Sequence, residues 1–270
     1  MTKQLAIKLS VILALILAVY FPTIRWMIDR WSVTDTYYSH GFLVPFICAF
    51  LVWFKRKELA TLPIQPEKIG WSVFAIGILI HLISSPIQVY FTSGFSLLIT
   101  IPGLVLIFLG KQWLKKLSFA ISFIFFMIPL PMLTIANLSF RLKILAAKIS
   151  TILVNSMGIA AIREGSIIQT RHANLVVEDP CSGIRSLIAL IALGALMAYF
   201  SNTTRWKKLI VFASSMPIAV GTNIVRITAL TVVSEMYGSK FATGFFHDMM
   251  GIVVFVLAFM GLAMVGKILE

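Results

Sequence analysis

The sequence predicts an all-α polytopic membrane protein, and three observations support this fold class. Hydrophobic residues make up 59% of the 270 residues and charged residues only 12%, whereas soluble domains carry about 25% charged residues. The mean hydropathy is +0.97. Long apolar runs alternate with short clusters of lysine and arginine, as expected for membrane spans and their loops. The net charge of +13 therefore does not indicate nucleic-acid binding, because no soluble basic surface carries it.

The apolar runs predict about eight transmembrane helices. The expected spans cover residues 9–24, 38–54, two segments within 69–110, and 117–132, 186–204, 209–225 and 249–266. The first run follows Lys3 and Lys8 and lacks a small-residue cleavage site, so we expect a retained span and not a signal peptide. The pair within 69–110 is expected to break near Ser84-Ser85-Pro86. Pro129 and Pro131 are expected to close or kink the fifth span.

The basic clusters predict the orientation in the membrane. They lie at residues 3–8, 55–57, 111–116, 205–208 and 267. With eight spans, all of them fall on one side, which the positive-inside rule identifies as the cytoplasm. Both termini are then cytoplasmic, and residues 25–40, 84–88, 134–179 and 227–248 face the other side. We therefore expect a multi-pass protein of the cell (inner) membrane.

The longest polar segment, about 134–180, predicts a small extracytoplasmic cap within a single domain over 1–270. Five apolar residues recur there at helical spacing, with Arg141, Lys143 and Lys148 between them: Leu138, Leu142, Leu145, Ile149 and Ile152. This pattern is typical of an amphipathic helix on an anionic membrane surface. Residues 165–169 and 173–177 predict a short β-hairpin after that helix.

Cys181 directly follows this polar segment and precedes a long apolar run. Pro180 suits a first helical turn, and Glu178 complements the positive end of the helix dipole. Unpaired backbone N–H groups at such a position favour the thiolate. In the expected topology, Arg226 and His247 reach the same extracytoplasmic surface. A thiolate, a fixed cation and a base are the groups that covalent acyl transfer requires.

Each of these residues also has a plainer interpretation. Cys181 could be a small buried hydrophobic residue, His247 an interfacial residue and Arg226 a snorkelling anchor. A transporter or channel lined by Arg226 and Glu235 is one alternative function. A non-catalytic scaffold of an export or polysaccharide assembly is another.

The second cysteine, Cys48, lies in mid-span, where a packing role is expected. We expect no disulfide. No CxxC motif or Cys/His spacing indicates a metal site, and no cofactor is expected. A thiol oxidoreductase is disfavoured because no resolving cysteine lies near Cys181.

Seven motifs resemble the exosortase/archaeosortase family in their order and rough spacing. They are YSHGFL at 38–43, PLP at 129–131, REG at 163–165, CSGIRSL at 181–187, PIA at 217–219, NIVR at 223–226 and HDMMG at 247–251. The element at 181–187 is the most specific, and the histidine at position 247 favours the bacterial exosortases. The resemblance implies a cysteine transpeptidase or protease. Its substrates would be exported proteins with a C-terminal sorting signal: a short motif such as Pro-Glu-Pro, a transmembrane helix and a basic tail.

The family's catalytic cysteine, arginine and histidine correspond to Cys181, Arg226 and His247. On this resemblance, the thiolate forms an acyl-enzyme and the histidine acts first as general acid and then as general base. The arginine stabilises the oxyanion, together with backbone N–H groups near Ser182 and Gly183. The acceptor stays open between water and an amine on a lipid or glycan carrier.

Four further residues are candidates for supporting roles. Arg185 could contact substrate or lower the pKa of the thiol, and its alternative role is a structural ion pair. Glu178 or Asp248 could orient the catalytic histidine or arginine, and the alternative is that both are surface charges. His40 could line the site, or it could make a structural hydrogen bond to a neighbouring helix end.

Overall fold

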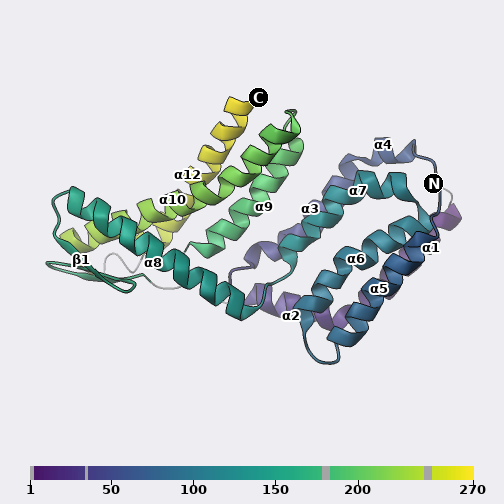
Figure 1. The fold of residues 1–270 in the computed structure, drawn as a ribbon, viewed down its shortest axis with the longest axis horizontal. Coiled ribbons are helices and arrows are strands. Elements are labelled where there is room, and N and C mark those ends of the chain that lie inside the picture. The colour runs from purple at the N-terminus through teal and green to yellow at the C-terminus, as the bar shows by residue number, and fades with distance from the viewer. Residues whose placement is uncertain (1–2, 34–35, 178–182, 240–244) are drawn as a thin grey trace. The chain divides into compact units, whose positions relative to one another are not determined.

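The computed structural model describes residues 3–33, 36–177, 183–239 and 245–270, and Figure 1 shows their fold. The side chains of residues 3–6, 9, 245, 247 and 248 lie outside this description. The chain forms two compact units, Met1–Pro131 and Met132–Glu270. The expectation of a single domain over 1–270 stays a prediction.

The first unit is built of helices. They are α1 (Lys3–Val19), α2 (Phe21–Ser32), the 3-10 helix η1 (Ser39–Phe42), α3 (Leu43–Phe54), α4 (Arg56–Ala60), α5 (Ile69–Ser84), α6 (Tyr90–Phe108), α7 (Lys111–Phe123) and the 3-10 helix η2 (Ile124–Met127). The predicted break near Ser84-Ser85-Pro86 is confirmed, because α5 ends at Ser84 and α6 begins at Tyr90. The helices of the predicted fifth span, 117–132, begin at Lys111 and end at Met127, so the expectation that Pro129 and Pro131 close or kink it is confirmed.

A sharp bend at Tyr20 divides the predicted first span, 9–24, into two helices. The axes of α1 and α2 differ by 70°, and Pro22 in the first turn of α2 has no N–H to continue the α1 ladder. The Val19 carbonyl at the bend accepts a hydrogen bond from His81 Nε2 at 3.1 Å. The Tyr20 hydroxyl, which is fully buried, bonds to side chains of α6. The polar groups released by the bend are therefore satisfied inside the unit.

The described helices agree with a polytopic membrane protein. Among them, three are long and apolar enough to cross a membrane, or up to five if each of two bent pairs forms one span. The three are Tyr90–Phe108, Arg205–Tyr237 and Met249–Leu269. Shorter apolar helices lie at Ser39–Phe54, Ile69–Ser84 and Ile184–Phe200. The number of eight spans stays a prediction. Six of the expected spans coincide with these six segments, and the expected spans 9–24 and 117–132 fall mostly in the two bent pairs, Ser10–Val19 with Phe21–Ser32 and Lys111–Met127 with Met132–Ser156.

The second unit combines helices with a small sheet. Its elements are α8 (Met132–Ser156), β1 (Ala161–Glu164), β2 (Ile167–Thr170), β3 (Asn174–Val176), α9 (Ile184–Phe200), α10 (Arg205–Tyr237) and α12 (Phe245–Leu269). The sheet is antiparallel in the order β1-β2-β3. The expected hairpin was therefore one strand short. The missed strand β1 pairs with β2 through a two-residue turn at Gly165 and Ser166, and Gly165 has a φ of +60°.

The expected amphipathic helix is present as α8, and its two faces differ in side-chain size. The face that packs on the unit is made mainly of small residues, such as Ala146, Ala147 and Ser150. Leu138, Leu145 and Ile152 recur every seven residues and are exposed. An apolar stripe that points away from the protein is what a helix on a membrane surface would present.

Helix α10 is much longer than the predicted span 209–225 and continues to Tyr237. The segment 227–248 was expected to lie beyond the span, but its first part is helical. Ile224, Ile227 and Leu230 are buried in one core with residues of α8 and with Ile168 and Leu175 of the sheet. This buried apolar contact stabilises the extra turns and places Arg226 inside a continuous helix.

Candidate active site

Gly183 begins helix α9 and lies against α10. It is the N-cap of α9, with φ +79° and ψ 0°, a left-handed conformation that glycine adopts most easily. A Cβ at this position would lie 2.6 Å from Cγ and 2.7 Å from Nδ2 of Asn223. The glycine is therefore required both by its backbone conformation and by the carboxamide packed against it.

Arg226 follows Asn223 by three residues and lies on the same side of α10. Asn223 is buried and Arg226 half-buried. On the neighbouring helix α12, a Cβ at Gly251 would lie 3.4 Å from Nη2 and 3.7 Å from Cζ of Arg226. The guanidinium thus lies against the backbone of α12, where the absent side chain leaves room for it. His247 precedes Gly251 by one helical turn.

One side of α10 therefore contacts the first residues of α9 and the first half of α12. Figure 1 shows these three helices together in the second unit, with α8 across them. Between Asn223 and Arg226, the Ile224 carbonyl accepts hydrogen bonds from Ser150 Oγ of α8 at 3.1 Å and from Thr228 Oγ1 at 2.8 Å. These hydroxyls fix the turn of α10 that carries the carboxamide and the guanidinium.

The sequence-predicted site residues are described to different extents. Cys181 and Glu178 lie at 178–182, outside the described residues. The expected start of the apolar helix at Pro180 was too early, because α9 begins at Ile184 with Gly183 as its N-cap. His247 and Asp248 belong to the first turn of α12, and their side chains lie outside the description. The meeting of Cys181, Arg226 and His247 in one site stays a prediction.

Arg185 is the second residue of α9 and is half-buried. Its Nε atom and that of Arg226 are shielded from solvent. A guanidinium that is partly withdrawn from water acts on nearby charge more strongly than one in bulk solvent.

His40 makes its described contacts within the first unit. Its Nε2 donates to the Phe126 carbonyl at 3.1 Å, and its ring stacks on Tyr38 with centroids 5.8 Å apart. The Tyr38 hydroxyl accepts a hydrogen bond from the Leu130 N–H at 3.1 Å. Two of the sequence motifs, YSHGFL and PLP, are therefore in contact. A role of His40 in the active site stays a prediction.

Two polar contacts were not foreseen from the sequence. From the sequence, Asn223 was named only as part of the NIVR motif. The signal that could have identified it is an amide side chain one helical turn before an arginine, within an apolar run. Glu235 accepts hydrogen bonds from the backbone N–H of His172 at 3.0 Å and from its Nδ1 at 2.7 Å. This pair ties the β2–β3 turn to the end of α10.

Cys48 packs in the first unit and donates to the Ala120 carbonyl at 3.2 Å.

These observations define a class of protein: a helical, multi-pass membrane protein in which Gly183 of α9 lies against Asn223 of α10, and Arg226 of α10 lies against Gly251 of α12. A family model described as transmembrane exosortase (Exosortase_EpsH) matches residues 31–264. The chain belongs to this family, whose membrane proteins are involved in protein sorting, and the resemblance noted from the motifs is confirmed. No curated protein and no solved structure matches the chain.

Proposed function

We propose that this protein is a membrane-embedded cysteine transpeptidase or protease that cleaves C-terminal sorting signals of exported proteins. The reaction proceeds through an acyl-enzyme on Cys181 at the extracytoplasmic membrane surface. The observation that supports it most is the double contact of α10. Asn223 packs on Gly183 and Arg226 packs on Gly251.

Chain connectivity relates the candidate residues to these two contacts. Cys181 lies two residues before Gly183, and consecutive Cα atoms are about 3.8 Å apart, so the two Cα atoms lie within roughly 8 Å. His247 lies four residues before Gly251, a rise of about 6 Å in an α-helix. Arg226 contacts Gly251. It follows Asn223, which contacts Gly183, by one helical turn. This arrangement favours a shared site over three unrelated structural residues.

In the first step, the Cys181 thiolate attacks the carbonyl carbon of the scissile peptide bond. The carbonyl π electrons move to oxygen, and Arg226 stabilises the resulting oxyanion. When the C–N bond breaks, protonated His247 donates its proton to the leaving amine, which departs with the transmembrane part of the signal. The exported protein is then held as a thioester.

In the second step, water or an amine attacks the thioester carbonyl. Neutral His247 removes a proton from this nucleophile, and the Cys181 thiolate leaves with the electrons of the C–S bond. Water makes the reaction a proteolysis, and an amine on a lipid or glycan carrier makes it a transpeptidation. Arg185, Glu178 and Asp248 are assigned supporting roles at this site, through contact with substrate or orientation of the catalytic pair.

The charge distribution supports an extracytoplasmic site. Basic clusters at 55–57, 111–116 and 205–208 mark the cytoplasmic ends of spans. Residues near 181 and 247 then lie on the other side of the inner membrane, with both termini in the cytoplasm. No specific observation favours the transporter alternative, because Glu235, a residue that had suggested it, binds His172 of the cap.

The proposed function is tested by the fate of a reporter substrate. The full-length protein is co-expressed with an exported reporter that ends in a Pro-Glu-Pro motif, a transmembrane helix and a basic tail. Mass spectrometry of the reporter's C-terminus should show cleavage by the wild type and by Cys48→Ala, and an intact tail with Cys181→Ala. A free carboxylate identifies water as the acceptor, and a mass adduct identifies an amine. Cleavage by Cys181→Ala at the wild-type rate would contradict the proposal.

A further inference from the structure

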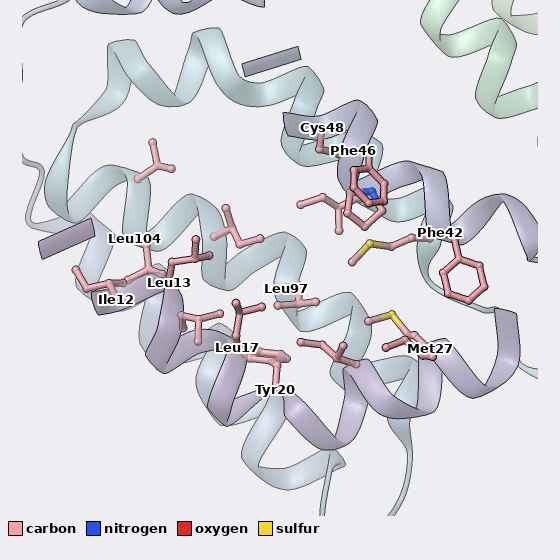
Figure 2. Close-up of a pocket in the computed structure, with 18 of the residues that line it drawn as sticks. Ile12, Leu13, Leu17, Tyr20, Met27, Phe42, Phe46, Cys48, Leu97 and Leu104 are labelled. Atoms are coloured by element: carbon pink, nitrogen blue, oxygen red, sulfur yellow. The ribbon is translucent and has the colours of Figure 1, made fainter. Parts of the chain in front are cut away.

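The first unit contains a large apolar cavity that the proposed reaction does not use. It has a volume of about 650 Å³ and is lined mainly by aliphatic and aromatic side chains of α1, α2, α3 and α6. Figure 2 shows Ile12, Leu13 and Leu17 of α1 on one side and Phe42 and Phe46 on the other. Leu13, Leu17 and Phe46 are more than half exposed, at 59%, 51% and 74%. The cavity is therefore open towards the surroundings of the membrane-spanning helices.

The polar atoms of the lining side chains are hydrogen-bonded to other groups of the protein. The Tyr20 hydroxyl bonds to Ser96 and Thr100 of α6 at 2.7 and 2.8 Å. Trp31 Nε1 donates to the Met127 carbonyl at 2.9 Å. Cys48 Sγ donates to the Ala120 carbonyl. A water molecule needs two to four polar partners to occupy a cavity. The walls that the structure describes therefore favour an apolar occupant over water.

The size of the cavity distinguishes between apolar occupants. A transmembrane helix of about 20 residues is about 30 Å long, and the cavity is shorter. Along α6, its lining runs from Leu97 to Leu109, about 18 Å at 1.5 Å per residue. This length is close to one half of the hydrocarbon core, which is about 30 Å thick. A single acyl chain of one leaflet fits these dimensions.

One end of the cavity carries net positive charge, because Lys8, Lys68 and Lys111 outnumber Glu67, whose backbone N–H donates to the Leu106 carbonyl. Ile12 and Leu104 mark this end in Figure 2, opposite Met27 and Phe42. Lys8 precedes Ile12 by one turn of α1, and Lys111 follows the lining residue Leu109 by two positions; both lysines are exposed. The opposite end is bordered by α2, whose Arg25, Asp29 and Arg30 carry mixed charge.

We propose that this cavity is a binding site for an anionic phospholipid. One acyl chain lies between α1 and α3 against α6, and the phosphate lies at the end marked by Lys8 and Lys111. The site is independent of the proposed chemistry at Cys181. Occupancy of this site therefore depends on the content of anionic lipid in the membrane.

Photolabelling of the reconstituted full-length protein tests the site. The probe is phosphatidylglycerol with a photoreactive acyl chain in phosphatidylcholine vesicles, and labelled peptides are mapped by mass spectrometry. Labels should concentrate on α1, α3 and α6, and unlabelled phosphatidylglycerol should displace them. Leu17→Trp, which fills the cavity, should reduce this labelling strongly. Leu15→Trp is the matched control, because Leu15 is 60% exposed on the same helix and does not line the cavity.

The headgroup is tested with a pair of double variants. Lys8→Gln with Lys111→Gln should weaken phosphatidylglycerol labelling about tenfold or more, since each basic residue near an anionic surface contributes about 1 kcal/mol, roughly fivefold in affinity. Arg25→Gln with Arg30→Gln should change it little. Equal labelling of Leu17→Trp and Leu15→Trp would overturn the site. A stronger effect of the arginine pair would overturn the headgroup position. Displacement by an apolar transmembrane peptide, but not by excess phosphatidylglycerol, would overturn the lipid as occupant.

Discussion

The carboxamide of Asn223 packs against the backbone of Gly183, at the point where helix α9 begins. This contact fixes the position of Gly183, which follows Cys181 and Ser182 in the sequence. Because Arg226 lies one turn further along α10 and touches α12 at Gly251, the same helix also positions the segment that carries His247. We regard α10 as the element that aligns the proposed site.

Gly183→Ala should destabilise the protein and abolish most of its activity. A left-handed conformation costs a non-glycine residue about 1–2 kcal/mol, and the new Cβ would also overlap Asn223. Gly158→Ala is the control, since Gly158 has a φ of +84° but nothing within 4 Å of a Cβ. The measurement is thermal unfolding of the purified variants together with reporter cleavage. Equal losses of thermal stability and of reporter cleavage in the two variants would show that the contact with Asn223 has no importance beyond backbone strain.

Gly251→Leu should slow reporter cleavage by displacing the Arg226 guanidinium. The matched control is Gly261→Leu on the same helix, where the nearest atom to a Cβ is Ile218 Cγ2 at 3.7 Å. Both substitutions add the same side chain to α12, so cleavage rates at equal amounts of inserted protein compare the two positions. If the Gly261 variant were impaired as much as the Gly251 variant, the contact with Arg226 would not be the cause.

Arg226→Lys should reduce the cleavage rate about 10²–10³-fold, the usual effect of losing one oxyanion-hole donor. Lysine retains the charge but not the planar set of donors, so raising the pH should not restore activity. The measurement is a pH series of cleavage rates for the wild type and the variant. A rate close to that of the wild type would remove Arg226 from oxyanion stabilisation and direct attention to Arg185.

The proposed orientation predicts on which side of the membrane four residues lie. Reporter fusions at Lys57, Lys116 and Lys208 should be active in the cytoplasm, because these residues belong to the basic clusters. An insertion at Gly165, in the exposed turn between β1 and β2, should be active only outside. A cytoplasmic Gly165 would contradict both the orientation and the location of the site.

Local sequence signals predicted the elements that depend on them. Prolines and serines marked the break between α5 and α6, and the helical spacing of five apolar residues identified α8: Leu138, Leu142, Leu145, Ile149 and Ile152. Pro22 is a local signal for the bend at Tyr20 as well, but the apolar run continues across it, and the contacts that satisfy the bend come from His81 and α6 far along the chain. The extra turns of α10 likewise depend on burial against the sheet.

The site was predictable to a similar extent. The residue types and the expected topology suggested Cys181, Arg226 and His247 as a set. The role of Asn223 required the contact with Gly183, which lies forty residues away in the sequence and is set by the packing of α9 on α10. A carboxamide in an apolar run indicates a buried polar contact, but its partner can be found only from the fold.

The acyl-enzyme itself is the most direct test of the central claim. The wild type and His247→Ala are incubated with the reporter substrate and quenched in acid, and peptides that contain Cys181 are examined by tandem mass spectrometry. The account predicts a reporter fragment in thioester linkage to Cys181, released by hydroxylamine and also formed by Cys48→Ala. It predicts a larger fraction of this adduct in His247→Ala if deacylation is slowed more than acylation. Efficient cleavage without any adduct, or an adduct on another residue, would contradict the account.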